Sequence, residues 1–177
     1  MKRVNVIGPP GAGKTFVSDA INRAYGLPMV GLDAFRHGPN WSEVPETLFE
    51  ERIAAAVAEE HWVIDGSYPS VRPLIWQRAD TVVWIDLSRR DVMRRLVWRS
   101  FRDWVSGREP VPGNRERLRH FIRPWHPMRW ARNNHAEFRK REEAWLKDPR
   151  WSHIAIVHLR SKAEIASFLD ALSQPTR

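Results

Sequence analysis

Short apolar runs alternate with longer amphipathic stretches along this chain of 177 residues. The runs are three to five residues long, rich in β-branched side chains, and most end at glycine or a charged residue. This is the pattern of strands that are buried on both faces. The runs cover residues 4–7, 29–32, 62–64, 81–85 and 154–157. They predict a three-layer α/β fold with a five-stranded parallel sheet covered by helices on both faces.

The stretches between these runs carry the spacing of amphipathic helices, with apolar residues three or four positions apart. They cover residues 14–25, 46–60, 88 to about 104, 115–147 and 161–172. Within 115–147, Pro124 and Pro127 interrupt the helical pattern, because proline lacks the backbone N–H that a helix interior uses. Glycine and proline place loops at residues 35–41 and 107–114.

The composition favours one globular domain over residues 1–177, in which we expect 100–147 to form a helical insertion or lid. Hydrophobic residues make up 42% and charged residues 28% of the chain, and it contains no cysteine, which excludes disulfides and thiolate metal sites. No apolar run approaches the ~20 residues of a membrane span. The first strand begins too close to Met1 for a signal peptide. We therefore expect a cytoplasmic protein.

The positive charge of the chain is concentrated in one segment. The whole chain carries +8, whereas residues 87–141 alone hold 15 arginines and one lysine against five acidic residues, a net +11. Phosphates, on nucleotides or on nucleic acid, are the natural partners of such a field. The alternative is an arginine-rich surface that faces only solvent.

A phosphate-binding loop follows the first strand and opens the first helix. The sequence fits G-x-x-x-x-G-K-[ST] at every fixed position. Its residues are Gly8, Pro9, Pro10, Gly11, Ala12, Gly13, Lys14 and Thr15. Backbone amides of such a loop cradle phosphate oxygens at the positive end of a helix, the lysine reaches the β- and γ-phosphates, and the hydroxyl coordinates Mg²⁺. We therefore predict ATP and Mg²⁺ as cofactors, against the alternative of a plain glycine-rich turn.

Further polar residues fall where the predicted strands end, which is where parallel sheets bind ligands. They are Gly8, Asp33, Asp65, Asp86 and Arg160. We expect Arg160 to contact the nucleotide. Asp33 would orient or deprotonate an acceptor hydroxyl, with a turn or helix cap as the alternative. Arg36 and His37 follow it and would contact the same acceptor, although a lone histidine is more often structural.

The block Val63-Ile64-Asp65-Gly66, followed by Pro69 and Arg72, resembles the adenylate-kinase-like group of P-loop kinases. The resemblance implies that Asp65 holds Mg²⁺ through water. It also implies that Asp65, Gly66 and Arg72 line the acceptor side, with Arg72 on a phosphate or other anionic group. The spacing to Arg72 is longer here than in adenylate kinase.

Residues 86–99 resemble the fourth strand of that family and the helix that enters its lid. By this resemblance, Arg95 would stack on adenine and Arg99, one helical turn later, would reach the phosphates in transfer. The alternative is an exposed pair of arginines. Over residues 3–172 the chain also resembles bacterial proteins described as DNA topology modulation or FlaR-like proteins. That resemblance includes the phosphate loop, the Asp65 block and the tryptophans of the basic segment.

Two functions are consistent with these features. In the first, the protein is a small-molecule or nucleotide kinase with Lys14, Asp33, Arg95 and Arg99 as its catalytic residues. In the second, it is a nucleic-acid-binding ATPase or regulator that grips a backbone with residues 87–141. Tryptophans among the arginines would stack on bases in the second case, but we favour their role as packing anchors. The sequence does not name the acceptor.

Overall fold

The computed structural model describes residues 1–38, 42–106 and 127–173. Five parallel strands form one sheet in the order β2-β3-β1-β4-β5. The strands are β1 (Arg3–Ile7), β2 (Met29–Gly31), β3 (Trp62–Asp65), β4 (Thr81–Ile85) and β5 (Ala155–Leu159). The predicted α/β fold with a five-stranded parallel sheet is therefore confirmed.

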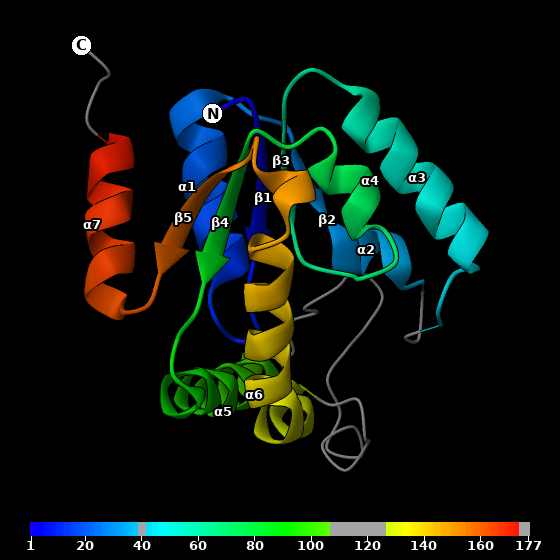
Figure 1. Ribbon diagram of the computed structural model, residues 1–177. Helices are drawn as coiled ribbons and strands as arrows, with labels where there is room; N and C mark the ends of the chain where they lie inside the picture. Colours follow the sequence, from blue (N-terminus) through cyan, green and yellow to red (C-terminus); the bar gives the residue numbers. More distant parts are fainter. Residues whose placement is uncertain (39–41, 107–126, 174–177) are drawn as a thin grey trace.

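Helices cover both faces of the sheet and its carboxyl end (Figure 1). They are α1 (Lys14–Tyr25), α2 (Leu32–Arg36), α3 (Glu46–Ala58), α4 (Arg72–Trp76), α5 (Arg89–Ser106), α6 (Pro127–Leu146) and α7 (Lys162–Ser173), with a 3₁₀ turn, η3, at Pro149–Trp151. α1 packs against α7, α3 against α4, and α5 against α6. The α5–α6 pair lies at the end toward which the strands point (Figure 1).

Two hydrophobic cores lie on opposite faces of the sheet. Val4 and Val6 of β1 belong to the core that α1 and α7 cover, whereas Ile7 belongs to the core that α3 and α4 cover. This division follows from the alternation of side chains along a strand. Trp76 anchors the second core, where its ring meets those of Trp145 and Trp151 edge-on at 5.9 and 5.7 Å.

Asn5 is a buried polar residue of β1 that ties the end of β3 to the sheet. Its Nδ2 donates to the carbonyl oxygens of Ile64 and Gly66 at 3.1 and 3.0 Å, and its Oδ1 accepts from Trp76 Nε1 at 2.9 Å. Each partner is therefore satisfied, and leaving one unpaired would cost about 1–3 kcal/mol. These bonds fix the backbone immediately after Asp65.

Two local details differ from the prediction. The strand expected over residues 29–32 ends at Gly31, and Leu32–Arg36 instead form helix α2, so that Asp33 lies in a first helical turn. Helix α4 was not predicted, because five residues are too few to show a helical period. Of the helix expected over residues 115–147, the described part is helical over Pro127–Leu146, as α6.

The predicted loop at 107–114 and the predicted helical residues 115–126 lie outside the described residues. The expected insertion or lid over 100–147 consequently has only its flanking helices, α5 and α6, in the described structure. In the described residues, no helix has the length and apolar character that crossing a membrane requires.

Candidate active site

The predicted phosphate loop lies between β1 and α1 and has the geometry of an anion cradle. Gly13 caps α1 with φ 97° and has no side chain that could bond the first-turn amides of the helix. The amides of Lys14 and Thr15 therefore remain for a ligand, at the positive end of the helix dipole. Lys14 Nζ folds back over the loop, 3.4 Å from the Pro9 carbonyl oxygen. These residues fit a bound polyphosphate.

Thr15 and Asp65 meet beside this loop, although 50 residues separate them in the chain. Thr15 Oγ1 donates to Asp65 Oδ2 at 2.6 Å. Asp65 Oδ1 is buried and has no hydrogen-bond partner. A hydroxyl and a carboxylate with one unsatisfied oxygen are the hard oxygen donors that Mg²⁺ prefers, so the pair fits a magnesium ion shared with nucleotide phosphates. Among the described residues, there is no group of three acidic or histidine side chains that would hold a metal without phosphate.

The ionisation of Asp65 depends on the groups around it. Burial raises the pKa of its carboxyl, the charge of Lys14 and the Thr15 hydrogen bond act against this rise, and the charges of Asp33 and Asp19 add to it. Asp33 is thus close enough to Asp65 for the two carboxylates to repel each other. A divalent cation between the phosphate loop and these carboxylates would relieve that repulsion.

Helix α5 packs directly on the phosphate loop. A Cβ atom at Gly11, where φ is 80°, would lie 2.6 Å from Leu96 Cγ, so only glycine permits this approach. Arg95 Nη1 donates to the Ala12 carbonyl oxygen at 2.6 Å. Arg99 lies one turn further along α5, and its Nε is buried without a hydrogen-bond partner. The structure therefore brings Arg95, the first of the predicted arginine pair, to the predicted phosphate loop.

Asp33 and Tyr68 meet on the other side of the site. Tyr68 Oη donates to Asp33 Oδ1 at 2.8 Å, and the Tyr68 ring packs edge-on against Phe49 at 5.3 Å. Burial, and then the charge of Asp33, raise the pKa of Tyr68 well above its ordinary value. Tyr68 therefore stays protonated and donates to Asp33.

The other predicted acceptor residues have protein partners. Arg36 Nη1 and Nη2 pair with Glu46 and Glu43 at 2.5 and 2.8 Å. Arg72 is buried, and its Nη2 bonds Glu142 Oε1 at 2.7 Å and Ser67 Oγ at 2.5 Å. These contacts do not favour the acceptor-binding role that the resemblance implied for Arg72.

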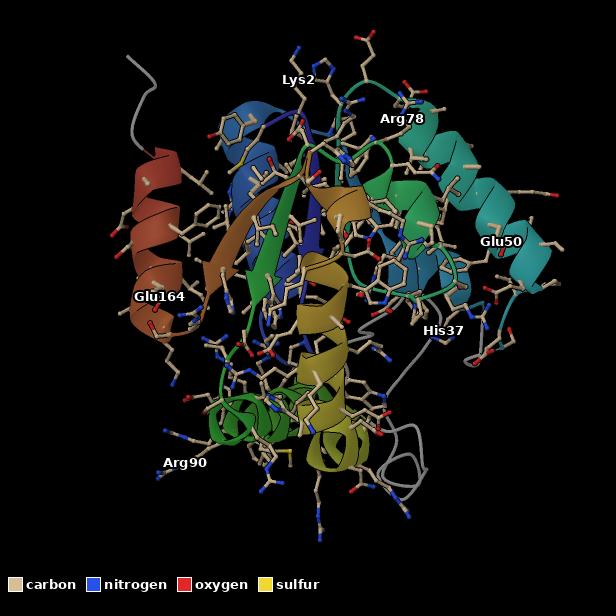
Figure 2. All side chains as sticks on the ribbon, in the orientation of Figure 1. Lys2, His37, Glu50, Arg78, Arg90 and Glu164 are labelled. Atoms are coloured by element: carbon tan, nitrogen blue, oxygen red, sulfur yellow. The ribbon has the colours of Figure 1, made fainter. Side chains whose placement is uncertain are left out.

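His37 belongs to an isolated bridge between residues 37 and 43, near the end of α2 (Figure 2). Its contact with the acceptor stays a prediction.

The carboxyl ends of β4 and β5 carry a further polar cluster. His158 Nε2 donates to Asp86 Oδ2 at 3.0 Å, because its Nδ1 accepts from Arg160 Nε at 3.2 Å. Arg139 of α6 also pairs with Asp86, at 3.1 Å, and the His158 ring stacks on Trp84 at 4.0 Å. Arg160, predicted to contact the nucleotide, is thus exposed and fixed by a histidine at this sheet edge.

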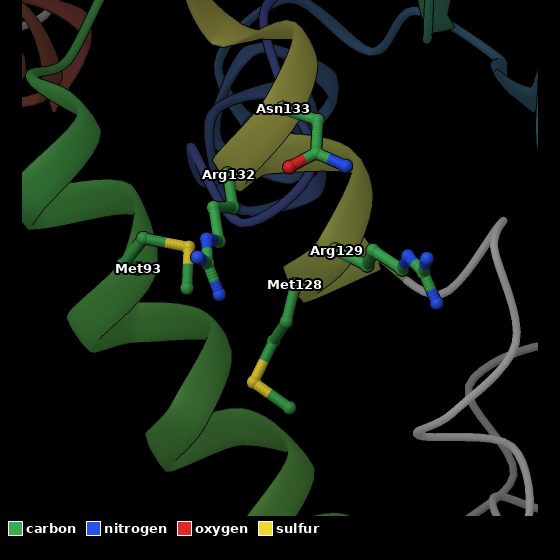
Figure 3. Close-up of a pocket in the computed structure, with 5 residues that line it drawn as sticks. All are labelled: Met93, Met128, Arg129, Arg132 and Asn133. Carbon is green, nitrogen blue, oxygen red and sulfur yellow. The ribbon is translucent and has the colours of Figure 1, made fainter.

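A pocket of about 500 Å³ opens between α5 and α6 (Figure 3). Its lining residues are Met93, Met128, Arg129, Arg132 and Asn133. Figure 3 shows Arg132 extending toward Met93, whereas Arg129 points away from α5. None of the predicted site residues lines this pocket.

Sequence reasoning missed Tyr68, Glu142 and His158. Tyr68 follows the Asp65-Gly66 block by two residues, so its place beside a strand end was a usable signal. Glu142 and His158 gave no such signal, since their partners lie 70 and 72 residues away in the chain.

Comparison with known proteins defines the class of the fold. No family model matches the chain, and no curated protein sequence does so at the required level of similarity. Among solved structures, a kinase candidate from Chloroflexus aurantiacus is similar, with a TM-score of 0.55 and 13% identity over 99% of each chain. A shikimate kinase from Bacteroides thetaiotaomicron has a TM-score of 0.52 and 16% identity over 97% of this chain and 95% of that one.

A shikimate kinase from Acinetobacter baumannii, solved with shikimate, has a TM-score of 0.50 and 16% identity over 97% of this chain and 90% of that one. The chain therefore has the fold of P-loop kinases.

Proposed function

We propose that this protein is an ATP- and Mg²⁺-dependent small-molecule kinase that transfers the γ-phosphoryl group of ATP to a hydroxyl group. One observation carries the proposal: Lys14, Thr15, Asp65 and Asp33, which come from three separate segments, converge at the phosphate loop. A phosphate cradle alone would suit any nucleotide-binding protein. The carboxylate of Asp33 beside it, held by Tyr68, supplies a group that can take the proton of an acceptor hydroxyl.

Each group has a defined task in such a transfer. The amides of the phosphate loop and Lys14 would hold the β- and γ-phosphates, and Thr15 and Asp65 would hold Mg²⁺, which neutralises phosphate charge. Asp33 would accept a hydrogen bond from the acceptor hydroxyl and then its proton. The side chains of Arg95 and Arg99, both on α5, would change conformation to contact the phosphoryl group. Positioning and electrostatics supply most of the rate in phosphoryl transfer, so no covalent intermediate is needed.

The alternative function, a nucleic-acid-binding ATPase or regulator, rests on the positive charge of residues 87–141. Figure 2 shows that Arg90 points outward from α5, whereas Lys2 and Arg78 lie at the opposite end of the molecule. Arg90 of the basic segment therefore lies at the end of the molecule that carries the phosphate loop (Figure 2). The resemblance to the FlaR-like proteins also remains a proposal, because no family model matches the chain.

The kinase proposal is tested by replacing the phosphate ligand. Lys14→Ala should abolish tight ATP binding in a protein that remains folded, because Lys14 contributes one weak contact to the fold. Calorimetric titration with ATP and Mg²⁺ measures the affinity, and circular dichroism checks the fold. Lys2→Ala is the matched control, since Lys2 lies at the far end of the molecule (Figure 2). Unchanged ATP affinity in folded Lys14→Ala would refute the proposal.

The activity itself is tested by ATP consumption. Purified protein is incubated with ATP, Mg²⁺ and a panel of nucleotides, nucleosides, sugars and other hydroxyl compounds. Stoichiometric formation of ADP and a phosphorylated acceptor is the expected result. ATP binding combined with ADP formation that no acceptor stimulates would instead favour the ATPase alternative.

A further inference from the structure

Five residues near Asp33 form two bonded groups that the Phe49 ring joins, and we name them the acceptor wall: Asp33, Arg36, Glu43, Glu46 and Tyr68. α2 supplies Asp33 and Arg36, one turn apart, and Glu46 begins α3. Tyr68 joins the two helices, because its ring packs on Phe49 of α3 while its hydroxyl reaches Asp33. The wall is therefore a connected structure.

Tyr68 leaves Asp33 with one oxygen for a ligand. Its hydroxyl donates to Oδ1, so Oδ2 is the oxygen that an acceptor hydroxyl would approach. The phenol is held by burial and by the edge-on contact with Phe49, and it thereby fixes the direction of the carboxylate. Tyr68 is a neutral donor, so its hydrogen bond brings no positive charge to the Asp33 carboxylate.

Arg36 is the cation of the wall, and its charge is already paired with carboxylates of the protein. Its two Nη atoms pair with two different glutamates, and its guanidinium lies 5.5 Å from the centre of the Phe49 ring. Only 17% of its side chain is exposed. Glu46 has its pKa lowered by hydrogen bonds from Ser70 and Arg36, so it is ionised and holds the guanidinium. An anionic ligand would have to displace a carboxylate to reach Arg36.

The charges of the wall do not balance. Asp33, Glu43 and Glu46 supply three carboxylates and Arg36 one guanidinium, whereas Asp65, next to Asp33, has the charge of Lys14 beside it. Arg72 cannot offset this excess, because it is buried against Glu142. Arg52, an exposed residue, donates to the Phe35 carbonyl oxygen at 3.2 Å. It is a cation close to the wall, so its effect on anionic ligands is tested separately.

We propose that the phosphoryl acceptor is a neutral or cationic hydroxyl compound, such as a polyol or an amino-polyol, and that the acceptor wall discriminates against carboxylate- and phosphate-bearing acceptors. The inference rests on the proposed kinase function and assigns its substrate class. Like charges brought together in a binding site cost several kcal/mol, which is enough to select among ligands of the same size. A protonated amine would instead gain from Asp33 and the glutamates.

The test uses three linear six-carbon probes that differ in the charge at one end: glucamine, glucitol and gluconate. Their affinities are measured by NMR titration of the full chain with Mg²⁺ and a non-hydrolysable ATP analogue. We expect gluconate to bind at least about tenfold more weakly than glucamine, with glucitol between them. Glu43→Gln/Glu46→Gln, which frees Arg36 and removes two charges, should shift the preference toward gluconate by about tenfold or more.

Three variants provide the controls. Glu50→Gln/Glu51→Gln removes two exposed charges from α3 without freeing Arg36, and it should preserve the wild-type order. Arg36→Gln should leave gluconate a weak ligand. Arg52→Gln tests whether this exposed arginine binds the carboxylate of gluconate, and it should likewise leave gluconate a weak ligand.

The proposal is overturned if wild type prefers gluconate, or if Arg36→Gln or Arg52→Gln weakens gluconate binding about tenfold or more. Equal affinity for the three probes in every variant, including no binding at all, would also overturn it, since the charge of the wall would then have no effect. None of these measurements requires turnover. The substrate class can therefore fail while ATP-dependent phosphorylation stands, and loss of ATP binding is detected separately by Lys14→Ala.

Discussion

The two sides of the candidate site use arginine in opposite ways. On the side of α5, Arg95 bonds a backbone carbonyl oxygen of the phosphate loop, and Arg99 has a buried Nε without a partner. On the side of α2 and α4, Arg36 and Arg72 pair with glutamates. The proposed function therefore requires the α5 arginines to move to the phosphates, whereas Arg36 and Arg72 are held by ion pairs.

The difference follows from the strength of the bonds. A carboxylate adds the attraction of a full negative charge to its hydrogen bond with a guanidinium, which a carbonyl oxygen does not, so a guanidinium paired with a carboxylate stays with its partner. A guanidinium bonded to a carbonyl oxygen loses less interaction energy when it moves to a charged phosphate than one bonded to a carboxylate does. The contacts around an arginine therefore indicate its role better than its place in the sequence does.

The largest expected effect concerns the phosphate side. Arg95→Ala should lower turnover by about 10³–10⁵-fold, as loss of an arginine that neutralises the transferring group does. Arg99→Ala should act similarly, whereas Arg90→Ala, which removes an outward-pointing charge, should leave turnover nearly unchanged (Figure 2). Steady-state ATP turnover with an identified acceptor measures the three variants.

A salt titration of DNA and RNA binding accompanies this measurement. Binding to long nucleic acid should be weak and should vanish near physiological salt, since only counterion release drives it. Tight binding that persists at physiological salt, with normal turnover in Arg95→Ala and Arg99→Ala, would refute the kinase and favour a nucleic-acid grip. In that case each arginine lost should reduce the slope of the logarithm of the binding constant against the logarithm of the salt concentration by about one.

The next effect concerns the structural side. Arg72→Met should lower the free energy of unfolding by about 3–5 kcal/mol, because it leaves the buried Glu142 with only the more distant Arg141, at 3.5 Å, as an ion-pair partner. The guanidinium also lies 5.3 and 5.0 Å from the ring centres of Trp76 and Trp145. Arg72→Met/Glu142→Leu should recover much of this loss, since no buried charge remains. Urea unfolding of the single and double variants measures the coupling, and equal losses in both would contradict it.

Asp65→Asn should produce a smaller, metal-dependent effect. If Asp65 holds Mg²⁺ through water, its loss should weaken the apparent affinity for Mg²⁺ by about 10–100-fold, the range for ligands in the outer shell of a metal. Turnover measured across Mg²⁺ concentrations should then rise at higher metal in the variant. Identical Mg²⁺ dependence in both proteins would leave Asp65 as a turn-forming residue only.

The same substitution has a small effect on stability that depends on pH. The pKa of Asp65 is raised in the folded protein, chiefly by burial, so folding favours the protonated carboxyl. Its contribution to stability is present below the ordinary pKa range of aspartate and is lost as the pH rises through the raised value. Without Mg²⁺ and near neutral pH, Asp65→Asn should therefore unfold at a higher urea concentration than wild type. Equal midpoints at acidic and neutral pH would contradict this.

Much of the fold follows from the sequence alone. Five apolar runs, each closed by a turn or a charge, determine the parallel sheet, because such strands must be covered on both faces. The phosphate loop is equally local, since consecutive residues supply the glycines, the lysine and the hydroxyl. Its place between β1 and α1 needed no information from elsewhere in the chain.

Only the tertiary structure decided which distant groups meet. Tyr68 reaches Asp33, Thr15 reaches Asp65, and Glu142 reaches Arg72, over 35, 50 and 70 residues of chain. Sequence patterns record periodicity and turn preference, which act over a few residues. Whether a guanidinium is free or neutralised depends on partners that only packing brings near, and the sequence by itself assigned Arg36, Arg72 and Arg95 to ligands alike.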